Sequence, residues 1–181
     1  MKTRIKRDLI DLMMVPGLSG HEDRVRRALR DRLDNMGVNS TSDRLGNLVA
    51  HFPGIGPRVM LFTHMDQLGF IVRRIEADGL IRLERLGGVP ERALAAQEVL
   101  VCVGEGRDVP GIIANKSHHA TAPSEKYQVT PYSDIYVDTG LSSASDVEAA
   151  GIRIGTPGGY APSPAVPRVP ATPLRPPPSR P

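Results

Sequence analysis

The sequence predicts an α/β protein: an α/β segment comes first, a small β-rich, barrel-like domain follows, and a proline-rich tail ends the chain. Three observations support this organisation. Apolar residues recur at helical spacing within residues 1–36. From residue 68 onward, short apolar runs alternate with glycine-containing turns, as is typical of strands. From residue 156 to 181, 10 of 26 residues are proline, which donates no backbone hydrogen bond, so we expect a disordered tail.

Two helices are expected at the amino terminus. Residues 5–13 carry an apolar stripe that ends before Pro16 and Gly17. Residues 19–22 read Ser-Gly-His-Glu, the pattern of a capping box, in which the serine and glutamate side chains bond to backbone N–H groups. The second helix should therefore open there, and Gly37 should close it.

Two strands are expected next, at residues 48–52 and 59–63, after a turn that begins at Asp43. The second strand reads Val-Met-Leu-Phe-Thr, an apolar run typical of a buried strand. The order helix–helix–strand–strand over residues 1–67 is the start of an α/β layer. It is too small to bury a convincing core alone.

Residues 68–155 predict the β-rich domain. Runs at 70–75 and 80–86 flank Ala-Asp-Gly, a strong signal for a hairpin. Ser143 has the position of a cap for a short helix that ends at Gly151. Further short strands are expected at 99–103, 109–114 and 134–137.

The charge of the chain does not favour a nucleic-acid partner. The formal net charge is +3, with 23 basic and 20 acidic residues. No acidic residue follows Glu148, whereas four arginines do, so the basic balance comes from the tail. No cluster of lysine and arginine is interleaved with aromatic residues.

The cysteine and the apolar runs favour a cytoplasmic protein without a membrane partner. Cys102 is the only cysteine, so no intrachain disulfide forms, and a small buried side chain is the simplest interpretation of it. Asp8 and Asp11 interrupt what would be the core of a signal peptide. No stretch approaches the roughly 20 apolar residues that span a bilayer.

His64 and Asp66 are the candidate site residues. They follow the apolar run at 59–63, and residues i and i+2 of an extended chain point to the same side. Such a pair suits a metal ligand and the carboxylate that orients it. A histidine without chemistry at the end of a strand remains the alternative. His118 and His119 are adjacent and lack partners at ligand spacing, so they are weaker candidates.

Several short motifs, in collinear order from residue 4 to 155, resemble the tetrahedral-shell metallo-aminopeptidases of peptidase family M forty-two, which includes glutamyl and deblocking aminopeptidases and endoglucanase-like members. The match is carried by Ser-Gly-His-Glu-Asp at 19–23, Asp-Arg-Leu-Gly-Asn at 43–47, Thr-His-Met-Asp-Gln-Leu-Gly-Phe at 63–70, Lys-Ser-His-His at 116–119, Asp-Ile-Tyr-Val-Asp-Thr-Gly at 134–140 and Gly-Ile-Arg-Ile-Gly at 151–155.

This resemblance implies an α/β/α zinc-exopeptidase domain, begun by residues 1–67, into which residues 68–155 are inserted as an oligomerisation domain. It implies two divalent metal ions, zinc or cobalt, peptide substrates and a homo-oligomer. His64 would bind one metal ion, and Asp66 would be the catalytic-site carboxylate that fixes its imidazole.

The remaining groups of such a site are missing from the sequence. No Asp, Glu or His follows residue 155, whereas the family takes a bridging Asp, a catalytic Glu and further ligands from a later segment. A catalytic zinc ion normally needs three protein ligands. We therefore expect an amino-terminal fragment that is inactive alone and binds at most one metal ion, weakly.

The tail, residues 156–181, has two interpretations: an out-of-frame reading, or a truncated paralogue with a disordered end. The alternative function is a non-enzymatic oligomerisation or peptide-interaction module built on the β-rich domain.

Overall fold

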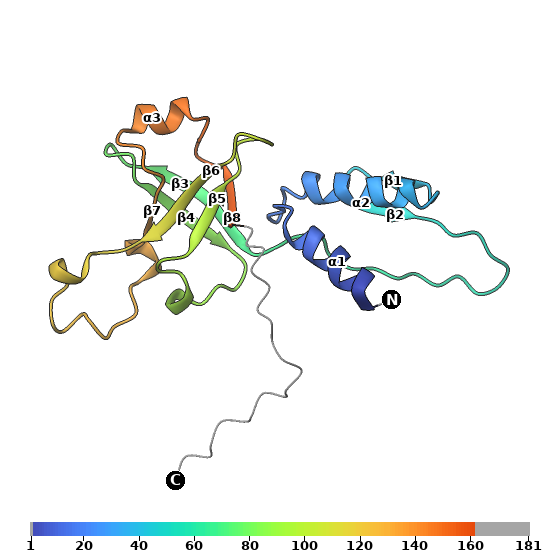
Figure 1. The fold of residues 1–181 in the computed structure, drawn as a ribbon, viewed down its shortest axis with the longest axis horizontal. Helices are drawn as coiled ribbons and strands as arrows, with labels where there is room; N and C mark the ends of the chain where they lie inside the picture. Colours follow the sequence, from blue (N-terminus) through green and yellow to red (C-terminus); the bar gives the residue numbers. More distant parts are fainter. Residues whose placement is uncertain (1, 162–181) are drawn as a thin grey trace, which may run out of the picture.

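The computed structural model describes residues 2–161, which form a small helical unit and a closed β-barrel (Figure 1). The tail was predicted to be disordered, and its residues 162–181 lie outside the described part of the chain. None of the helices within residues 2–161 has the length and hydrophobicity that crossing a lipid bilayer requires.

The helical unit contains the two predicted helices and a short hairpin. Helix α1 covers Lys2–Met13 and α2 covers Asp23–Asn35. Strand β1, Ser40–Ser42, pairs antiparallel with β2, Leu48–Ala50. The turn between them is organised by Asp43, whose Oδ1 accepts hydrogen bonds from the backbone N–H groups of Leu45 and Asn47, both at 2.9 Å.

Six antiparallel strands form a closed barrel: β3 (Gly69–Ile75), β4 (Ile81–Leu86), β5 (Glu98–Val101), β6 (Val109–Ala114), β7 (Tyr136–Asp138) and β8 (Pro157–Tyr160). Their order around the barrel is β3-β4-β7-β6-β5-β8. The predicted hairpin at residues 77–79 joins β3 to β4. Helix α3, Ala144–Ala149, follows Ser143, whose hydroxyl accepts a hydrogen bond from Asp146 N at 3.1 Å, as the sequence predicted.

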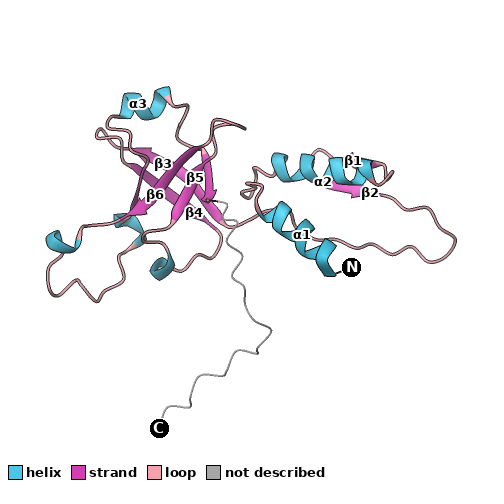
Figure 2. Ribbon diagram, viewed as in Figure 1, coloured by secondary structure: helices cyan, strands magenta, loops and turns pink. Residues whose placement is uncertain are grey.

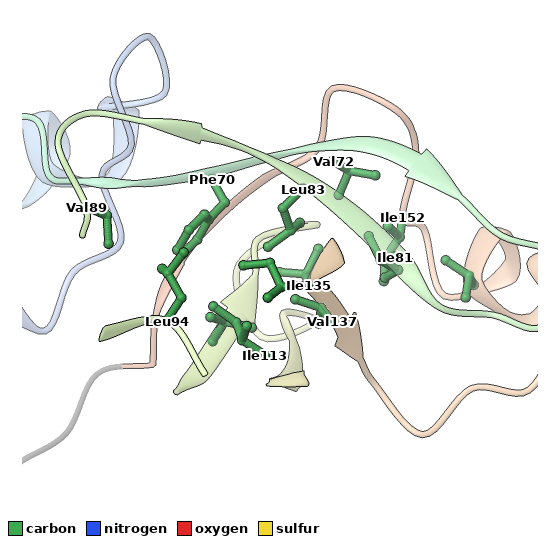
Figure 3. Close-up of a cluster of buried hydrophobic side chains, with 13 residues drawn as sticks. Phe70, Val72, Ile81, Leu83, Val89, Leu94, Ile113, Ile135, Val137 and Ile152 are labelled. Atoms are coloured by element: carbon green, nitrogen blue, oxygen red, sulfur yellow. The ribbon is translucent and has the colours of Figure 1, made fainter. Parts of the chain in front are cut away.

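The hydrophobic core lies inside the barrel (Figure 3). Thirteen buried apolar residues form it, and all of them lie between Phe70 and Ile152. Phe70 is fully buried, and its ring packs edge-on against that of Tyr160 with centroids 5.6 Å apart. In the helical unit, by contrast, Leu18 and Val25 are the buried hydrophobic residues. The barrel therefore holds a core of its own.

The boundary predicted at residue 155 is too early. Strand β8 inserts between β3 and β5 and closes the barrel, so residues 157–160 of the predicted disordered tail are ordered. The sequence Pro-Gly-Gly-Tyr reads as a turn, which hid the strand. Proline is accommodated because it is the first residue of the strand. Gly158 lies between two strands where a Cβ atom would come within 3.3 Å of the Leu100 carbonyl oxygen.

The predicted strand at 59–63 is wrong for the described structure. Residues 51–66 form an extended segment that leaves β2, makes a long excursion and returns past α1 before it reaches the barrel (Figure 1). Among residues 2–161 no strand pairs with it, so its apolar side chains face solvent. Strand β2 likewise ends at Ala50 rather than at residue 52. His64 was predicted to follow the end of a strand in a sheet, but no sheet surrounds it in the described structure.

Candidate functional site

The segment that carries His64 and Asp66 is attached to the loop between α1 and α2. The backbone N–H of Gln67 donates to the carbonyl oxygen of Gly17 at 2.7 Å, and its side-chain Nε2 donates to the carbonyl of Val15 at 3.1 Å. Leu18 and Gln67 form a parallel β-bridge. Residues 65–67 are therefore held against the helical unit although residues 51–64 are exposed.

The predicted pair is formed. His64 Nδ1 lies 3.0 Å from Asp66 Oδ1 and 3.2 Å from the Asp66 carbonyl oxygen. Both neighbours only accept hydrogen bonds when Asp66 is ionised, so Nδ1 carries the proton in either contact. In the neutral imidazole this leaves the lone pair on Nε2. The His64 side chain is 83% exposed, so Nε2 is open to a ligand.

A third residue, Ser19, completes this arrangement from a distant part of the sequence. Its hydroxyl donates a hydrogen bond to Asp66 Oδ2 at 2.8 Å. This hydrogen bond makes the largest contribution to holding the pKa of Asp66 below its ordinary value, and the hydrogen bond from His64 acts in the same direction. Asp66 is therefore ionised at neutral pH, and each of its two carboxylate oxygens accepts a hydrogen bond.

The capping box predicted at residues 19–22 is not formed. Helix α2 begins at Asp23 with Glu22 as its N-cap, and no side chain caps it. Glu22 instead accepts a hydrogen bond from the backbone N–H of Gly20 at 2.7 Å, and the Ser19 hydroxyl is used by Asp66. Sequence reasoning missed this role because the two residues are 47 positions apart and no local pattern links them.

His64 and Asp66 fit one ligand position of a metal site but not a whole site. The oriented imidazole with an accessible Nε2 is the geometry of a histidine ligand and its supporting carboxylate. Within residues 2–161, however, no three side chains of His, Cys, Asp or Glu gather closely enough to hold a metal ion. The described residues therefore present one candidate ligand and no complete metal site.

The other titratable candidates do not form a site. His118 and His119 lie in an exposed turn of 3₁₀-helix with their rings 5.8 Å apart, edge to face, and no third ligand joins them in the described chain. Burial raises the pKa of the Cys102 thiol to about 11, so it is protonated and unreactive at neutral pH. Asp138 accepts a hydrogen bond from Gly140 N at 2.8 Å, which is a turn contact.

An ion pair joins the helical unit to the barrel. The Arg24 guanidinium on α2 binds both carboxylate oxygens of Asp108, with the Nη2 to Oδ1 contact at 2.8 Å. Asp108 also accepts a hydrogen bond from Gly104 N at 3.1 Å. Both charged side chains are largely buried, with exposed fractions of 16% and 13%. Nearby, Arg27 pairs with Glu105 at an exposed position.

A cleft of about 470 Å³ lies beside this ion pair, between the loop after α1, the start of α2 and strand β8. His64 and Asp66 are not among the residues that line it, so it is separate from the candidate site. Its lining includes Gly17, His21, Arg24, Gln67, Cys102 and Tyr160.

The comparisons with known proteins agree on one family. The model of the M42 glutamyl aminopeptidase family matches residues 46–167. Lysyl aminopeptidase of Pyrococcus furiosus is 36% identical over 151 residues, which are 82% of this chain and 43% of that protein. The putative aminopeptidase SgcX of Escherichia coli is 33% identical over 160 residues, or 87% of this chain and 43% of that protein.

Solved structures show the same relationship. The TET aminopeptidase of the marine sediment archaeon Thaumarchaeota archaeon SCGC AB-539-E09 aligns with a TM-score of 0.76 at 29% identity, over 84% of this chain and 43% of that one. Aminopeptidase APDkam598 of Desulfurococcus kamchatkensis aligns with a TM-score of 0.74 at 31% identity, over 84% and 42%. The TET1 peptidase of Pyrococcus horikoshii, described as assembling into a tetrahedron or a large octahedral shell, shares the fold at 23% identity and a TM-score of 0.76.

The chain spans less than half the length of these relatives. The resemblance inferred from the His-Met-Asp run and its companion motifs is confirmed, because the matched residues make up more than half of the chain. The chain belongs to the M42 glutamyl aminopeptidase family.

Proposed function

We propose that this chain supplies one part of a metallo-aminopeptidase, and that it contributes His64 as a ligand to one of two divalent metal ions. Zinc and cobalt are the ions that the family resemblance implies. The reaction would be hydrolysis of amino-terminal residues from peptides, in which the metal ions polarise the scissile carbonyl and activate water. The lysyl aminopeptidase name of one relative supports this reaction class.

One observation carries the proposal: Ser19, Asp66 and His64 form a chain of hydrogen bonds that ends at an exposed Nε2. An exposed histidine without a chemical role would not require a carboxylate such as Asp66 to orient its ring, nor a hydroxyl such as that of Ser19 to hold the carboxylate. The arrangement fixes the tautomer and ring orientation that metal coordination requires. Asp66 would thus act on the metal through His64.

The rest of the machinery would come from residues outside this sequence. Two metal ions close together need a shared anionic ligand, and a general base must take a proton from the bound water. No Asp, Glu or His follows residue 155 to supply them. We therefore propose that the 181-residue chain is inactive alone and binds at most one metal ion weakly.

The barrel would be the inserted domain and would mediate homo-oligomerisation. The self-contained core of thirteen residues supports a separate domain, whereas its part in homo-oligomerisation is what the family resemblance implies. Residues 1–67 would then be the start of the catalytic domain. Family membership does not favour the alternative of a non-enzymatic module.

Hydrolysis of aminoacyl p-nitroanilides tests the proposed inactivity. With added Zn²⁺ or Co²⁺, the full chain should release nitroaniline no faster than the metal ion alone. His51→Ala is the matched control for His64→Ala, because His51 is also exposed and lies in the same segment. Turnover that His64→Ala abolishes and His51→Ala preserves would show that the chain is an enzyme by itself.

A further inference from the structure

One wall of the barrel is closed mainly by side chains. Within residues 2–161, strands β4 and β7 pair only through Ile81 and Val137, whereas every other two neighbouring strands of the barrel share three or more residue pairs. Strand β4 nevertheless continues to Leu86. The chain that lies along this continuation is the turn of 3₁₀-helix Tyr132–Asp134, just before β7.

The Tyr132 side chain takes the place of a neighbouring strand there. Its hydroxyl donates a hydrogen bond to the carbonyl oxygen of Leu83 on β4. Burial raises the pKa of Tyr132 to about 12, while a backbone hydrogen bond from Arg85 acts in the opposite direction. The hydroxyl therefore stays protonated and able to donate near neutral pH. A paired strand would satisfy the same edge of β4 with its own backbone N–H and C=O groups.

Two arginines of β4 complete this closure. The Arg85 guanidinium lies 5.3 Å from the centroid of the Tyr132 ring, and that of Arg82 lies 5.5 Å from the centroid of the Tyr136 ring, both within the range of cation–π attraction. Arg82 also donates to the carbonyl oxygen of Asp134 at 3.2 Å. A few side-chain contacts therefore hold this wall in place of a main-chain ladder.

The segment that leads into this wall, residues 115–134, has little else to hold it. Figure 2 shows it as a long loop with short helical turns that extends away from the barrel strands. None of its residues is buried. Apart from the bonds to β4, its hydrogen bonds to described residues lie within the segment, such as Lys116 to Glu125 at 3.0 Å, or at its first residue, where the Tyr136 hydroxyl donates to the Asn115 carbonyl at 3.4 Å.

We propose that residues 115–134 form a strap that detaches from the barrel as one unit, and that the Tyr132 hydroxyl is the catch that keeps it closed on β4. Strand β7 stays in place when the strap opens, because it shares three residue pairs with β6 and its Val137 is fully buried. Opening uncovers the edge of β4 around Leu83 and Arg85, whose backbone groups are then free to pair with an extended chain.

Hydrogen exchange of the full chain, resolved by residue, tests this proposal. Tyr132→Phe removes the hydroxyl but keeps the ring that packs beneath Arg85. Loss of one hydrogen bond should make amide exchange at the β4 edge that faces the strap about 3–10 times faster. Exchange in β5 and β6 should not change, because the strap opens without unfolding the barrel. The variant leaves His64 and Asp66 untouched, so the outcome is independent of the proposed metal ligation.

Tyr136→Phe is the matched control. It removes a hydroxyl from the fixed end of the strap, where the bond of 3.4 Å is at the limit of hydrogen-bond length, so exchange at the β4 edge should change by no more than about twofold. Unchanged exchange in Tyr132→Phe, or an equal effect of Tyr136→Phe, would overturn the proposal. Faster exchange throughout the barrel would also overturn it, because Tyr132 would then stabilise the whole domain instead of holding one strap.

Discussion

Replacing Phe70 with alanine is expected to lower the free energy of unfolding of the barrel by about 3–5 kcal/mol. The Phe70 side chain is fully buried in the core and packs against the Tyr160 ring on β8. Its removal leaves a cavity that the closed barrel can fill only in part, because six strands fix the spacing of the wall. Urea unfolding monitored by far-ultraviolet circular dichroism measures the loss.

Phe62→Ala is the matched control for this prediction. The same side chain is removed, but Phe62 is 90% exposed, so the free energy of unfolding should change by no more than about 0.5 kcal/mol. Comparable destabilisation by the two variants would mean that residues 59–62 are buried in the isolated chain. That result would contradict two claims: that the segment is exposed, and that the barrel holds a separate stable core.

Replacing Arg24 with alanine is expected to loosen the helical unit from the barrel by about 1–3 kcal/mol. The change removes a two-pronged ion pair and leaves the Asp108 carboxylate largely buried, with Gly104 N still bound to it. Hydrogen exchange should become faster in α2 and stay unchanged in the barrel core.

Arg27→Ala is the comparison variant for Arg24→Ala. Its partner is Glu105, and the two side chains are 54% and 63% exposed, so the pair contributes about 0–1 kcal/mol. Exchange in α2 should therefore respond to Arg24→Ala much more than to Arg27→Ala. If both variants accelerated exchange equally, burial of the Arg24 pair would not be the feature that docks the helix.

The same ion pair predicts a pH dependence. Burial opposes ionisation of Asp108, but the hydrogen bonds from Arg24 and Gly104 outweigh it, and the pKa of Asp108 lies below its ordinary value of 3.8. A carboxyl group whose pKa is lower in the folded state stabilises that state at pH above the ordinary value and loses this contribution as the pH falls. Docking of α2 should therefore weaken on acidification below about pH 4, and Arg24→Ala should flatten that dependence.

Local sequence signals predicted the parts of the fold that depend on neighbouring residues. Gly79 sits at a positive φ of 85° in the turn of the β3–β4 hairpin, a conformation that glycine adopts without strain. Ser143 caps α3, and Asp43 organises the turn before β2, both through bonds that span four residues or fewer. Helices α1 and α2 were predicted from apolar periodicity together with local start and stop residues.

Features that depend on distant contacts could not be predicted in this way. Strand β8 forms from a sequence that reads as a turn, because β3 and β5 provide edges for it. Residues 59–63 have the composition of a buried strand but find no neighbour within the described chain. The His64–Asp66 pair was predictable because it spans two residues, whereas Ser19 required the loop after α1 to meet residue 66.

Zinc titration of the full chain, followed by the nitrogen chemical shifts of its five histidines, tests the central claim most directly. If His64 is a metal ligand oriented by Asp66, its Nε2 resonance should move on weak zinc binding, and His64→Ala should abolish the uptake while His51→Ala preserves it. Zinc uptake that persists in His64→Ala, or that shifts His118 and His119 instead, would contradict the assignment of His64 as the metal ligand.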